Sequence, residues 1–210
     1  MQQMTERERI TQETYYAIAS DWAREHGNTE YWRQEFEMFR RMMPRGRVLD
    51  IGCGYGRDYH FFRDAGYDYV GLDSCGNFLA DMHARFPEAK LVQANMSSIP
   101  NLFRENSFNG FWAAASLLHI EKKDIKGVLN GIKRKVRPNG IGFISLKKGE
   151  GERIVRMERE GWASEDVRFF AYYHEREFTK ILIDCGIAPI GIHKREAHED
   201  TWLEFFVKCI

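Results

Sequence analysis

The chain has 210 residues, and its 31 Lys and Arg side chains balance its 31 Asp and Glu side chains, so the formal net charge is zero. This length is enough to bury one sizeable core and predicts one α/β domain rather than two. A balanced charge provides no global positive field for nucleic acid, and this favours a small substrate.

The cysteines and the N-terminal residues indicate the cellular setting. The four cysteines lie far apart and form no C-x-x-C pair, which argues against a zinc ribbon or a thioredoxin-like redox pair. Residues 1–9 are charged, and no apolar run approaches the length that crosses a membrane. We therefore expect a reduced, cytoplasmic location, no membrane partner and no metal centre.

The first 45 residues predict two helices ahead of the first strand. In the second of them, apolar residues recur at helical spacing, at Trp32, Phe36, Phe39 and Met43. Asn28 or Thr29 can cap the start of this helix, and Pro44 ends it. The earlier helix carries the apolar residues Tyr15, Tyr16, Ile18, Ala19 and Trp22.

A glycine-rich loop follows the first predicted strand. Residues 47–51 form a short apolar run that contains Asp50, as expected of a buried parallel strand. Gly52, Gly54 and Gly56 follow at intervals of two residues, and residues 58–65 then predict a helix. Glycines let the chain turn with positive φ and let a ligand approach backbone N–H groups at the helix N-terminus. The pattern is therefore typical of a nucleotide-binding loop.

Strand and helix signals alternate along the middle of the chain. The predicted strands span residues 47–51, 69–73, 90–94, 108–115 and 141–146. One helix ends at Pro87, and another is capped by Asp124 and stops at residues 138–140. Strands separated by helix-length segments imply right-handed crossovers and a parallel sheet covered on both faces.

The C-terminal part follows a different pattern. Residues 177–185 predict a helix closed by Gly186, and strand-like runs follow at 188–194 and 201–209. The connection between these runs is too short for a helical crossover, so we expect an antiparallel hairpin. Residues 147–175 are the least regular part, and we expect them above the carboxyl ends of the strands, where ligands bind.

Asp73 ends the second strand, 21 residues after Gly52, where its carboxylate oxygens can accept hydrogen bonds from ribose hydroxyls. Its alternative role is to cap the helix that begins near Gly76. Two classes of nucleotide-binding site are then possible, and the first of them is the dinucleotide site. The dinucleotide fingerprint G-x-G-x-x-G requires glycine at position 57, where the chain has Arg57. A dinucleotide dehydrogenase would also end in another crossover rather than in a hairpin.

The other class fits these features. The D-x-G-x-G-x-G loop, residues 108–120 and residues 135–141 resemble, in that order, three motifs of class I S-adenosylmethionine-dependent methyltransferases. The resemblance covers roughly residues 44–147. It implies a Rossmann-like, seven-stranded, mostly parallel sheet that ends in an antiparallel hairpin, with helices on both faces. The whole chain, 1–210, is then one domain, made of a helical N-terminal cap (1–45), a cofactor-binding core (46–147), and a substrate cap segment with the last helix and the hairpin (148–210).

The resemblance implies S-adenosylmethionine as the cofactor and gives roles to individual residues. Asp50 orients the glycine loop and the methionine amino group, Asp73 binds the ribose, and Ser74 lies beside the adenine. Asn95 stands where many relatives have Asp, and its carbonyl still offers an acceptor to the adenine amino group. The implied cofactor-binding residues are Asp50, Gly52, Cys53, Gly54, Gly56, Asp73, Ser74, Asn95, Met96, Ala115 and Tyr16.

The N-terminal aromatic residues have two interpretations. Tyr15, Tyr16 and Trp22 could close over the cofactor as a lid, as in many relatives, or they could simply pack an amphipathic helix. His119 is the candidate general base, because it follows the fourth strand at the cleft, and a base is needed only if the acceptor is protonated. Further candidates for the base are Arg168, Tyr172, Tyr173 and His174.

The methyl acceptor has three interpretations. A neutral aromatic cap of Phe169, Phe170, Tyr172, Tyr173, Trp162 and Trp32 suits a small apolar or aromatic metabolite. The order of aromatic residues near the C-terminus also resembles wobble-uridine tRNA methyltransferases, which would use the basic residues around 122–137, although such a run is usually a solvated helix face. The third interpretation is a non-catalytic protein that binds S-adenosylmethionine and acts as a partner of another protein.

Overall fold

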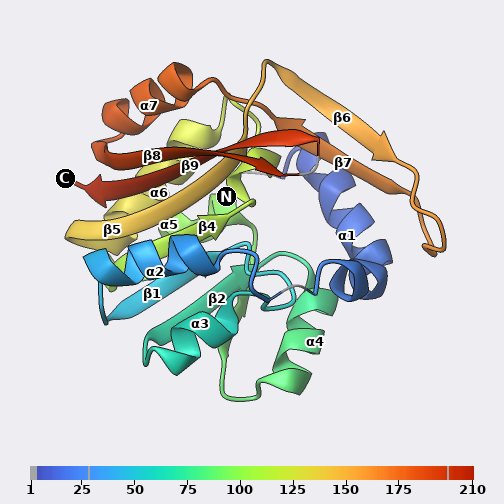
Figure 1. Cartoon of the computed structure of the whole chain (residues 1–210), viewed down its shortest axis with the longest axis horizontal. Coiled ribbons are helices and arrows are strands. Elements are labelled where there is room, and N and C mark those ends of the chain that lie inside the picture. Colours follow the sequence, from blue (N-terminus) through green and yellow to red (C-terminus); the bar gives the residue numbers. More distant parts are fainter. Residues whose placement is uncertain (1–3, 28, 198) are drawn as a thin grey trace.

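The computed structural model describes residues 4–27, 29–197 and 199–210. A seven-stranded sheet with the order β3-β2-β1-β4-β5-β9-β8 forms the centre of the molecule (Figure 1). Its strands are β1 (Arg47–Ile51), β2 (Asp68–Asp73), β3 (Lys90–Gln93), β4 (Phe108–Ala114), β5 (Val136–Lys147), β8 (Ile187–Ala197) and β9 (Asp200–Cys209). Strands β1 to β5 pair in parallel, and β9 runs antiparallel to both β5 and β8. The predicted mostly parallel sheet with a terminal antiparallel hairpin is confirmed.

Helices cover both faces of this sheet. They are α1 (Glu6–Glu25), α2 (Arg33–Met42), α3 (Tyr59–Asp64), α4 (Gly76–Arg85), α5 (Ile99–Leu102), α6 (Ile125–Lys135) and α7 (Glu175–Asp184), with the short 3₁₀ turns η1 (Met96–Ser98) and η2 (Leu117–His119). On one face, α6 and α7 pack on side chains such as Leu49 and Ile144. On the other face, α2 and α3 pack on Val48, Trp112 and Phe143. Neighbouring strand residues therefore point to opposite cores, as a doubly covered sheet requires.

The predicted apolar stripe of the second helix is confirmed, because Trp32, Phe36 and Phe39 of α2 and its cap are buried. The predicted cap is wrong where the structure describes it. The N-cap is Trp32, without a side-chain hydrogen bond, and Thr29 lies in the preceding turn. Asn28 lies outside the described residues.

Strand β5 begins earlier than the sequence indicates. The predicted helix stop at residues 138–140 lies inside β5, which follows α6 directly. Residues 136 and 141 of β5 pair with Phe108 and Gly110 of β4. Between these two pairs, β5 advances by five residues while β4 advances by only two. Asn139, with φ of 66°, allows this irregularity. The turn-forming residues therefore produce a bulge in the strand pairing rather than a loop.

The segment predicted to be irregular forms a second sheet instead. Strands β6 (Glu152–Met157) and β7 (Asp166–Ala171) pair as an antiparallel hairpin. Helix α1 lies along β7, where the Thr14 hydroxyl donates to the Val167 carbonyl and the Phe169 N–H donates to the Thr11 hydroxyl (Figure 1). Backbone groups that would otherwise be open at this edge are satisfied by α1. The N-terminal helix and this hairpin thus depend on each other.

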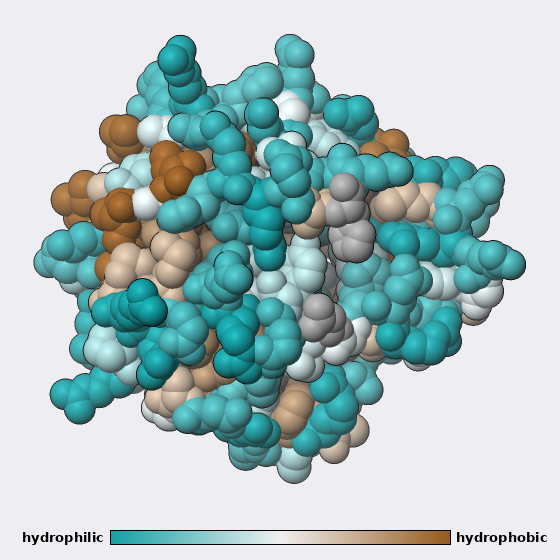
Figure 2. Space-filling model, in the orientation of Figure 1, coloured by the Kyte–Doolittle hydropathy of each residue, from teal (hydrophilic) through white to brown (hydrophobic). Residues whose placement is uncertain are grey.

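The outer surface is largely hydrophilic in the view of Figure 2. Apolar side chains gather on the side where α7 and the ends of β8 and β9 lie, and the exposed ones there include Ile183, Ile190 and Ile210. None of the helices in the described part of the chain combines the length and apolar character that a membrane crossing requires.

Candidate functional site

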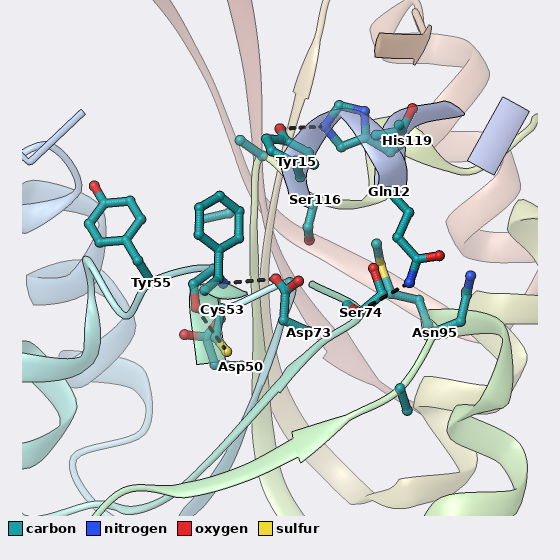
Figure 3. A pocket seen from close by; sticks show the side chains of 18 of the residues that line it. Gln12, Tyr15, Asp50, Cys53, Tyr55, Asp73, Ser74, Asn95, Ser116 and His119 are labelled. Atoms are coloured by element: carbon teal, nitrogen blue, oxygen red, sulfur yellow. Dashed lines mark hydrogen bonds between the residues drawn. The ribbon is translucent and has the colours of Figure 1, made fainter. Parts of the chain in front are cut away.

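A pocket lies at the carboxyl ends of β1, β2 and β4, and α1 covers it (Figure 3). The structure brings most of the predicted site residues together here. The predicted residues that line the pocket are Asp50, Gly52, Cys53, Gly54, Asp73, Ser74, Asn95, Met96, Ala115 and His119. Gly56 and Tyr16 do not line it. Gly56 packs against α4 instead, because a Cβ there would lie 2.6 Å from the Met82 sulfur.

The glycine loop presents bare backbone to the pocket. The N–H groups of Gly52 and Cys53 donate to the Leu72 carbonyl, and the Gly54 N–H donates to Asp73 Oδ2 at 2.8 Å. A Cβ on Gly52 would lie 2.4 Å from Ser116 Cβ, whereas a Cβ on Gly54 would have no atom within 4 Å. Gly52 is therefore required by packing, and Gly54 faces open space with φ of 55°.

Asp73 joins the glycine loop to the start of α4. Its Oδ2 accepts from Gly54 N–H, and its Oδ1 accepts from Cys75 N–H at 2.8 Å. Burial raises the pKa of the Asp73 carboxyl, and the backbone hydrogen bonds from Cys75 and Gly54 partly offset this rise. Each carboxylate oxygen keeps acceptor capacity. The carboxylate can therefore support the helix start and still accept hydrogen bonds from ligand hydroxyls.

Asp50 is buried at the end of β1 and accepts a hydrogen bond from the Tyr69 hydroxyl at 2.8 Å. Burial, followed by the charge of Asp58, raises its pKa well above the ordinary value. Among the described residues, Leu72 and Asp73 hold the glycine loop by hydrogen bonds, and Asp50 does not. In the described part of the chain, no hydrogen bond joins Asp50 to the glycine loop, and its predicted role in orienting that loop stays a prediction.

Arg57 lies in the pocket wall. In the sequence it attracts notice only because it stands where the dinucleotide fingerprint has a glycine. Its guanidinium donates to both Asp58 oxygens, at 2.7 and 3.1 Å, and Asp58 also accepts from Trp112 Nε1. Three more carboxyl groups, those of Glu8, Asp50 and Asp73, line the pocket. Because Asp58 already neutralises Arg57, the remaining charge of the described lining is acidic and suits a cationic ligand.

His119 belongs to a directed hydrogen-bond chain. Its Nδ1 lies 2.7 Å from the Phe169 carbonyl oxygen and must carry the proton, so Nε2 accepts from the Tyr15 hydroxyl at 3.1 Å (Figure 3). Arg168 Nη1 donates to the Tyr15 oxygen at 2.8 Å. Burial, followed by the Arg168 charge, lowers the pKa of His119 to about 3. His119 is thus neutral, and a proton from a ligand could reach it only through Tyr15.

Arg168 is held in place by Asp166, on the side away from Tyr15. Asp166, which is fully buried, accepts from Arg168 Nε at 2.6 Å and from Nη2 at 2.9 Å. This bidentate pair fixes the position of the guanidinium. Arg168, a predicted candidate for the base, lies behind Tyr15 and outside the pocket lining.

The predicted aromatic cap is wrong. Phe169, Phe170 and Tyr173 are buried in one hydrophobic core and Trp32 in the other, and these four do not line the pocket; neither do Tyr172, Trp162 or His174. The hairpin β6–β7 turns Phe169 and Phe170 into the core beside η2 instead of leaving them over the strand ends. The aromatic residues that do line the pocket are Tyr15, Trp22, Tyr55 and Phe78.

Residues of α1 were only partly predicted. Tyr15 and Trp22 line the pocket, as the lid interpretation expects, whereas the hydroxyl of Tyr16 donates to the Ser74 carbonyl and accepts from Gln93 Nε2. Glu8, Thr11 and Gln12 line it too and were not predicted. They lie seven, four and three residues before Tyr15 and so share one helix face with it, which is the signal that could have found them.

Two polar groups near the strand ends were also unexpected. Asn95 Oδ1 accepts from both the N–H and the hydroxyl of Ser97, at 3.0 Å each, so its carbonyl is occupied and its NH₂ group is the one left for a ligand. The Ser116 hydroxyl is buried, has no hydrogen-bond partner among the described residues, and lines the pocket (Figure 3). Ser116 follows Ala115, whose φ is 57°, a strained value for a residue with a side chain.

The thiols offer no obvious chemistry. All four cysteines are free and buried, and burial raises the pKa of Cys53, the one that lines the pocket, well above the ordinary value. A buried thiol of this kind is a small core residue. In the part of the chain that the structure describes, no group of three or more His, Cys, Asp or Glu side chains is arranged to hold a metal ion.

Comparisons with known proteins agree with this geometry. Residues 48–140 match the sequence model of a family described as a methyltransferase domain. An uncharacterized methyltransferase of Synechocystis sp. is 28% identical over 98 residues, covering 47% of this chain and 45% of that protein. The demethylmenaquinone methyltransferase of Renibacterium salmoninarum is 28% identical over 114 residues, covering 54% of this chain and 46% of that protein. The chain therefore spans less than half of the length of these curated relatives.

A solved structure matches over nearly the whole chain. The 1,6-didemethyltoxoflavin-N1-methyltransferase of Burkholderia thailandensis, a structure with bound S-adenosylhomocysteine, has a TM-score of 0.68 and 21% identity and covers 95% of this chain and 90% of that chain. At this identity the similarity establishes the fold.

The fold and the pocket define a Rossmann-like protein with a nucleotide-type site at the carboxyl ends of its parallel strands. The matched segment contains the glycine loop and Asp73, which shape this site. The matched methyltransferase-domain model, the relatives named as methyltransferases and the shared fold support the resemblance to class I S-adenosylmethionine-dependent methyltransferases that the motifs carry.

Proposed function

We propose that the protein transfers a methyl group from S-adenosylmethionine to a small-molecule acceptor. The observation that carries the proposal is the bare backbone of Gly54, which faces an open pocket while its N–H is held by Asp73. Relatives named as methyltransferases support the reaction class. The division of the chain into a cap (1–45), a core (46–147) and a second cap segment (148–210), and a cytoplasmic location, belong to the same proposal.

The residues present fit the cofactor. The orphaned Ser116 hydroxyl and the open space at Gly54 are features that a ligand would satisfy. Asp73 would hold the ribose, Ser74 and the Asn95 NH₂ group would flank the adenine, and the loop 52–54 would meet the methionine end. When bound, S-adenosylmethionine supplies a methyl group on a positively charged sulfur, and the acidic lining suits that charge.

The surface charges favour a small acceptor over tRNA. Three of the basic residues around α6 form ion pairs, Lys122 with Glu177 at 2.6 Å, Lys123 with Glu121 at 3.2 Å and Lys126 with Asp184 at 2.8 Å. Paired lysines of this kind form a solvated helix face and release few counterions on binding nucleic acid. The pocket, in contrast, is covered by α1 and walled by aromatic side chains, which suits a compact acceptor.

The first test is ligand binding. Calorimetry should show binding of S-adenosylmethionine and S-adenosylhomocysteine and no tight binding of NAD. Labelled methyl from S-adenosylmethionine should then pass into the low-molecular-weight fraction of a cell extract. Label in tRNA alone would favour the nucleic-acid alternative, and cofactor binding without transfer to any fraction would favour a non-catalytic partner protein.

Gly54→Ala separates binding from folding. A left-handed alanine costs about 1 kcal/mol of stability, and the new Cβ enters open space in the pocket, so we expect a loss of about tenfold or more in S-adenosylhomocysteine affinity. Gly66→Ala is the matched control, because Gly66 has φ of 74°, no atom within 4 Å of its Cβ position, and no place in the pocket lining. It should have the same stability cost and full affinity. Equal affinities of the two variants would contradict the assignment of Gly54.

A further inference from the structure

We propose that the methyl acceptor is a neutral amine whose N–H group donates a hydrogen bond to the Tyr15 hydroxyl oxygen. This inference rests on the proposed function and adds the chemical class of the acceptor. It is carried by the hydrogen-bond partners around Tyr15, which set the direction of each bond when the buried His119 ring is neutral.

The direction of the hydrogen bonds from Arg168 through Tyr15 to His119 is set by the groups at both ends. The Phe169 carbonyl can only accept, so His119 Nδ1 carries the proton and Nε2 can only accept. The Tyr15 hydroxyl must therefore donate its proton to Nε2. Arg168 can only donate, and it donates to the Tyr15 oxygen. Asp166 holds Arg168 in this position through two hydrogen bonds.

This arrangement leaves one lone pair on the Tyr15 oxygen. Its proton and its other lone pair are already used within the protein, while the side chain lines the pocket. A ligand group that meets Tyr15 must therefore be a donor, an N–H or an O–H. A carboxylate or a thiolate has no proton to give and would also face the carboxyl groups of the lining.

Among the described residues of the lining, no base is placed to take a proton from a hydroxyl acceptor at Tyr15. Tyr15 and Arg168 face His119 from α1 and β7, Lys147 of β5 adds a second positive charge, and both ring nitrogens are engaged. The hydrogen bonds of the carboxyl groups run elsewhere, that of Glu8 to Thr5, that of Asp50 to Tyr69, and those of Asp73 to Gly54 and Cys75, and none of them runs to Tyr15 or His119. An alcohol or phenol at Tyr15, which must lose its proton to become a good nucleophile, is therefore disfavoured.

A neutral amine needs no base. Its nitrogen keeps a lone pair for attack while an N–H points to Tyr15. In the transfer a nitrogen–carbon bond forms and a carbon–sulfur bond breaks, the positive charge passes from sulfur to nitrogen, and the extra proton leaves later to water. The acidic lining favours the cationic product, and the aromatic walls of Trp22, Tyr55 and Phe78 suit an apolar group attached to the nitrogen.

The experiment begins with the protein loaded with S-adenosylhomocysteine, and benzylamine, benzyl alcohol and benzoate are titrated by calorimetry. We expect benzylamine, at a pH above its pKa, and benzyl alcohol each to bind at least tenfold more tightly than benzoate, and the transfer assay then separates the amine from the alcohol. In a parallel assay with labelled S-adenosylmethionine and a cell extract, label should be recovered in the amine fraction. If the cofactor binds but label enters only acids, alcohols or phenols, the inference is overturned while the proposed function stands. If neither S-adenosylmethionine nor S-adenosylhomocysteine binds, the proposed function itself fails.

Tyr15→Phe tests the residue. It should weaken benzylamine binding by about tenfold while S-adenosylhomocysteine affinity stays within about threefold. Tyr59→Phe is the matched control, because the Tyr59 hydroxyl bonds Glu88 away from the pocket, and it should change neither affinity. Should Tyr15→Phe not fold, nitrogen NMR of the intact protein gives an independent answer. The ring of His119 should remain in the neutral Nδ1–H form down to pH 5, and protonation near pH 6 to 7 would overturn the inference.

Discussion

Replacing Asp73 by alanine is expected to lower the affinity for S-adenosylhomocysteine by about 10- to 100-fold, which corresponds to about 1–3 kcal/mol. Two effects combine in this loss. The ribose hydroxyls would lose their acceptor, and the Gly54 and Cys75 N–H groups would lose theirs, so the glycine loop would no longer be tied to β2. The variant should therefore unfold at a lower temperature as well as bind more weakly, and both are measurable by calorimetry.

Two further variants make this result specific. Asp73→Asn keeps an acceptor for only part of these contacts and should lie between wild type and alanine. Asp68→Ala removes an exposed carboxylate from the other end of the same strand, where it pairs with Lys90 and Arg47. Such a surface pair contributes about 0–1 kcal/mol, and its loss should leave cofactor affinity unchanged. Wild-type affinity in Asp73→Ala would remove Asp73 from the site.

The sheet could be predicted because its signals are local. The apolar runs of β1, β2 and β4 and the helix-length segments between them require crossovers, and the short connection between β8 and β9 leaves only a hairpin. Prolines ended the helices where expected after Met42 and Arg85. These features depend on spacing along the chain, which the sequence displays directly.

The hairpin β6–β7 could not be predicted in the same way. Its strand β6 has a mixed, charged sequence and stands apart from the main sheet, and β7 is stabilised by α1, which lies more than 130 residues earlier in the chain. The α1 side chains that form hydrogen bonds with the backbone of β7 are remote in sequence, so local sequence patterns could not predict this hairpin. The error in the aromatic cap followed from this, since the hairpin decides that Phe169 and Phe170 point into the core.

The sequence predicted the residues that shape the backbone of the site, but not the hydrogen bonds that decide where its protons lie. Gly52, Gly54 and Asp73 were found because a strand-to-helix loop needs those residue types at those positions. The role of Tyr15 depends on Arg168 and His119, which three separate elements bring together. The sequence contains no sign of which nitrogen of a histidine is occupied, so its candidate base was named from location alone.

A separate carboxyl group is expected to make the stability of the protein depend on pH. Glu204 of β9 is buried beside Glu35 of α2 and Arg195 of β8, and its neighbours across the sheet are Ser145 and His193. Burial, followed by the charge of Glu35, raises the pKa of Glu204 to about 7 from its ordinary value of 4.5. The folded protein therefore prefers the protonated carboxyl, whereas the unfolded chain ionises it at lower pH.

The sign of the effect follows from this difference. The contribution of Glu204 to stability is fully present below about pH 4.5 and is lost as the pH rises to about 7, by about 3 kcal/mol. Glu204→Gln, which stays uncharged, should remove this loss. In urea unfolding, the variant should resemble wild type at pH 4.5 and be more stable than wild type at pH 8.

The neighbouring carboxyl groups provide the controls for Glu204. Glu35→Gln removes the charge that helps to raise the pKa of Glu204, so the loss of stability should begin at lower pH and be smaller in total. Glu196→Gln replaces an exposed carboxylate on β8 and should leave the difference in stability between pH 4.5 and 8 as it is in wild type. Parallel stability curves for wild type and Glu204→Gln would mean that the buried carboxyl is ionised at no cost, with Arg195 compensating its charge fully.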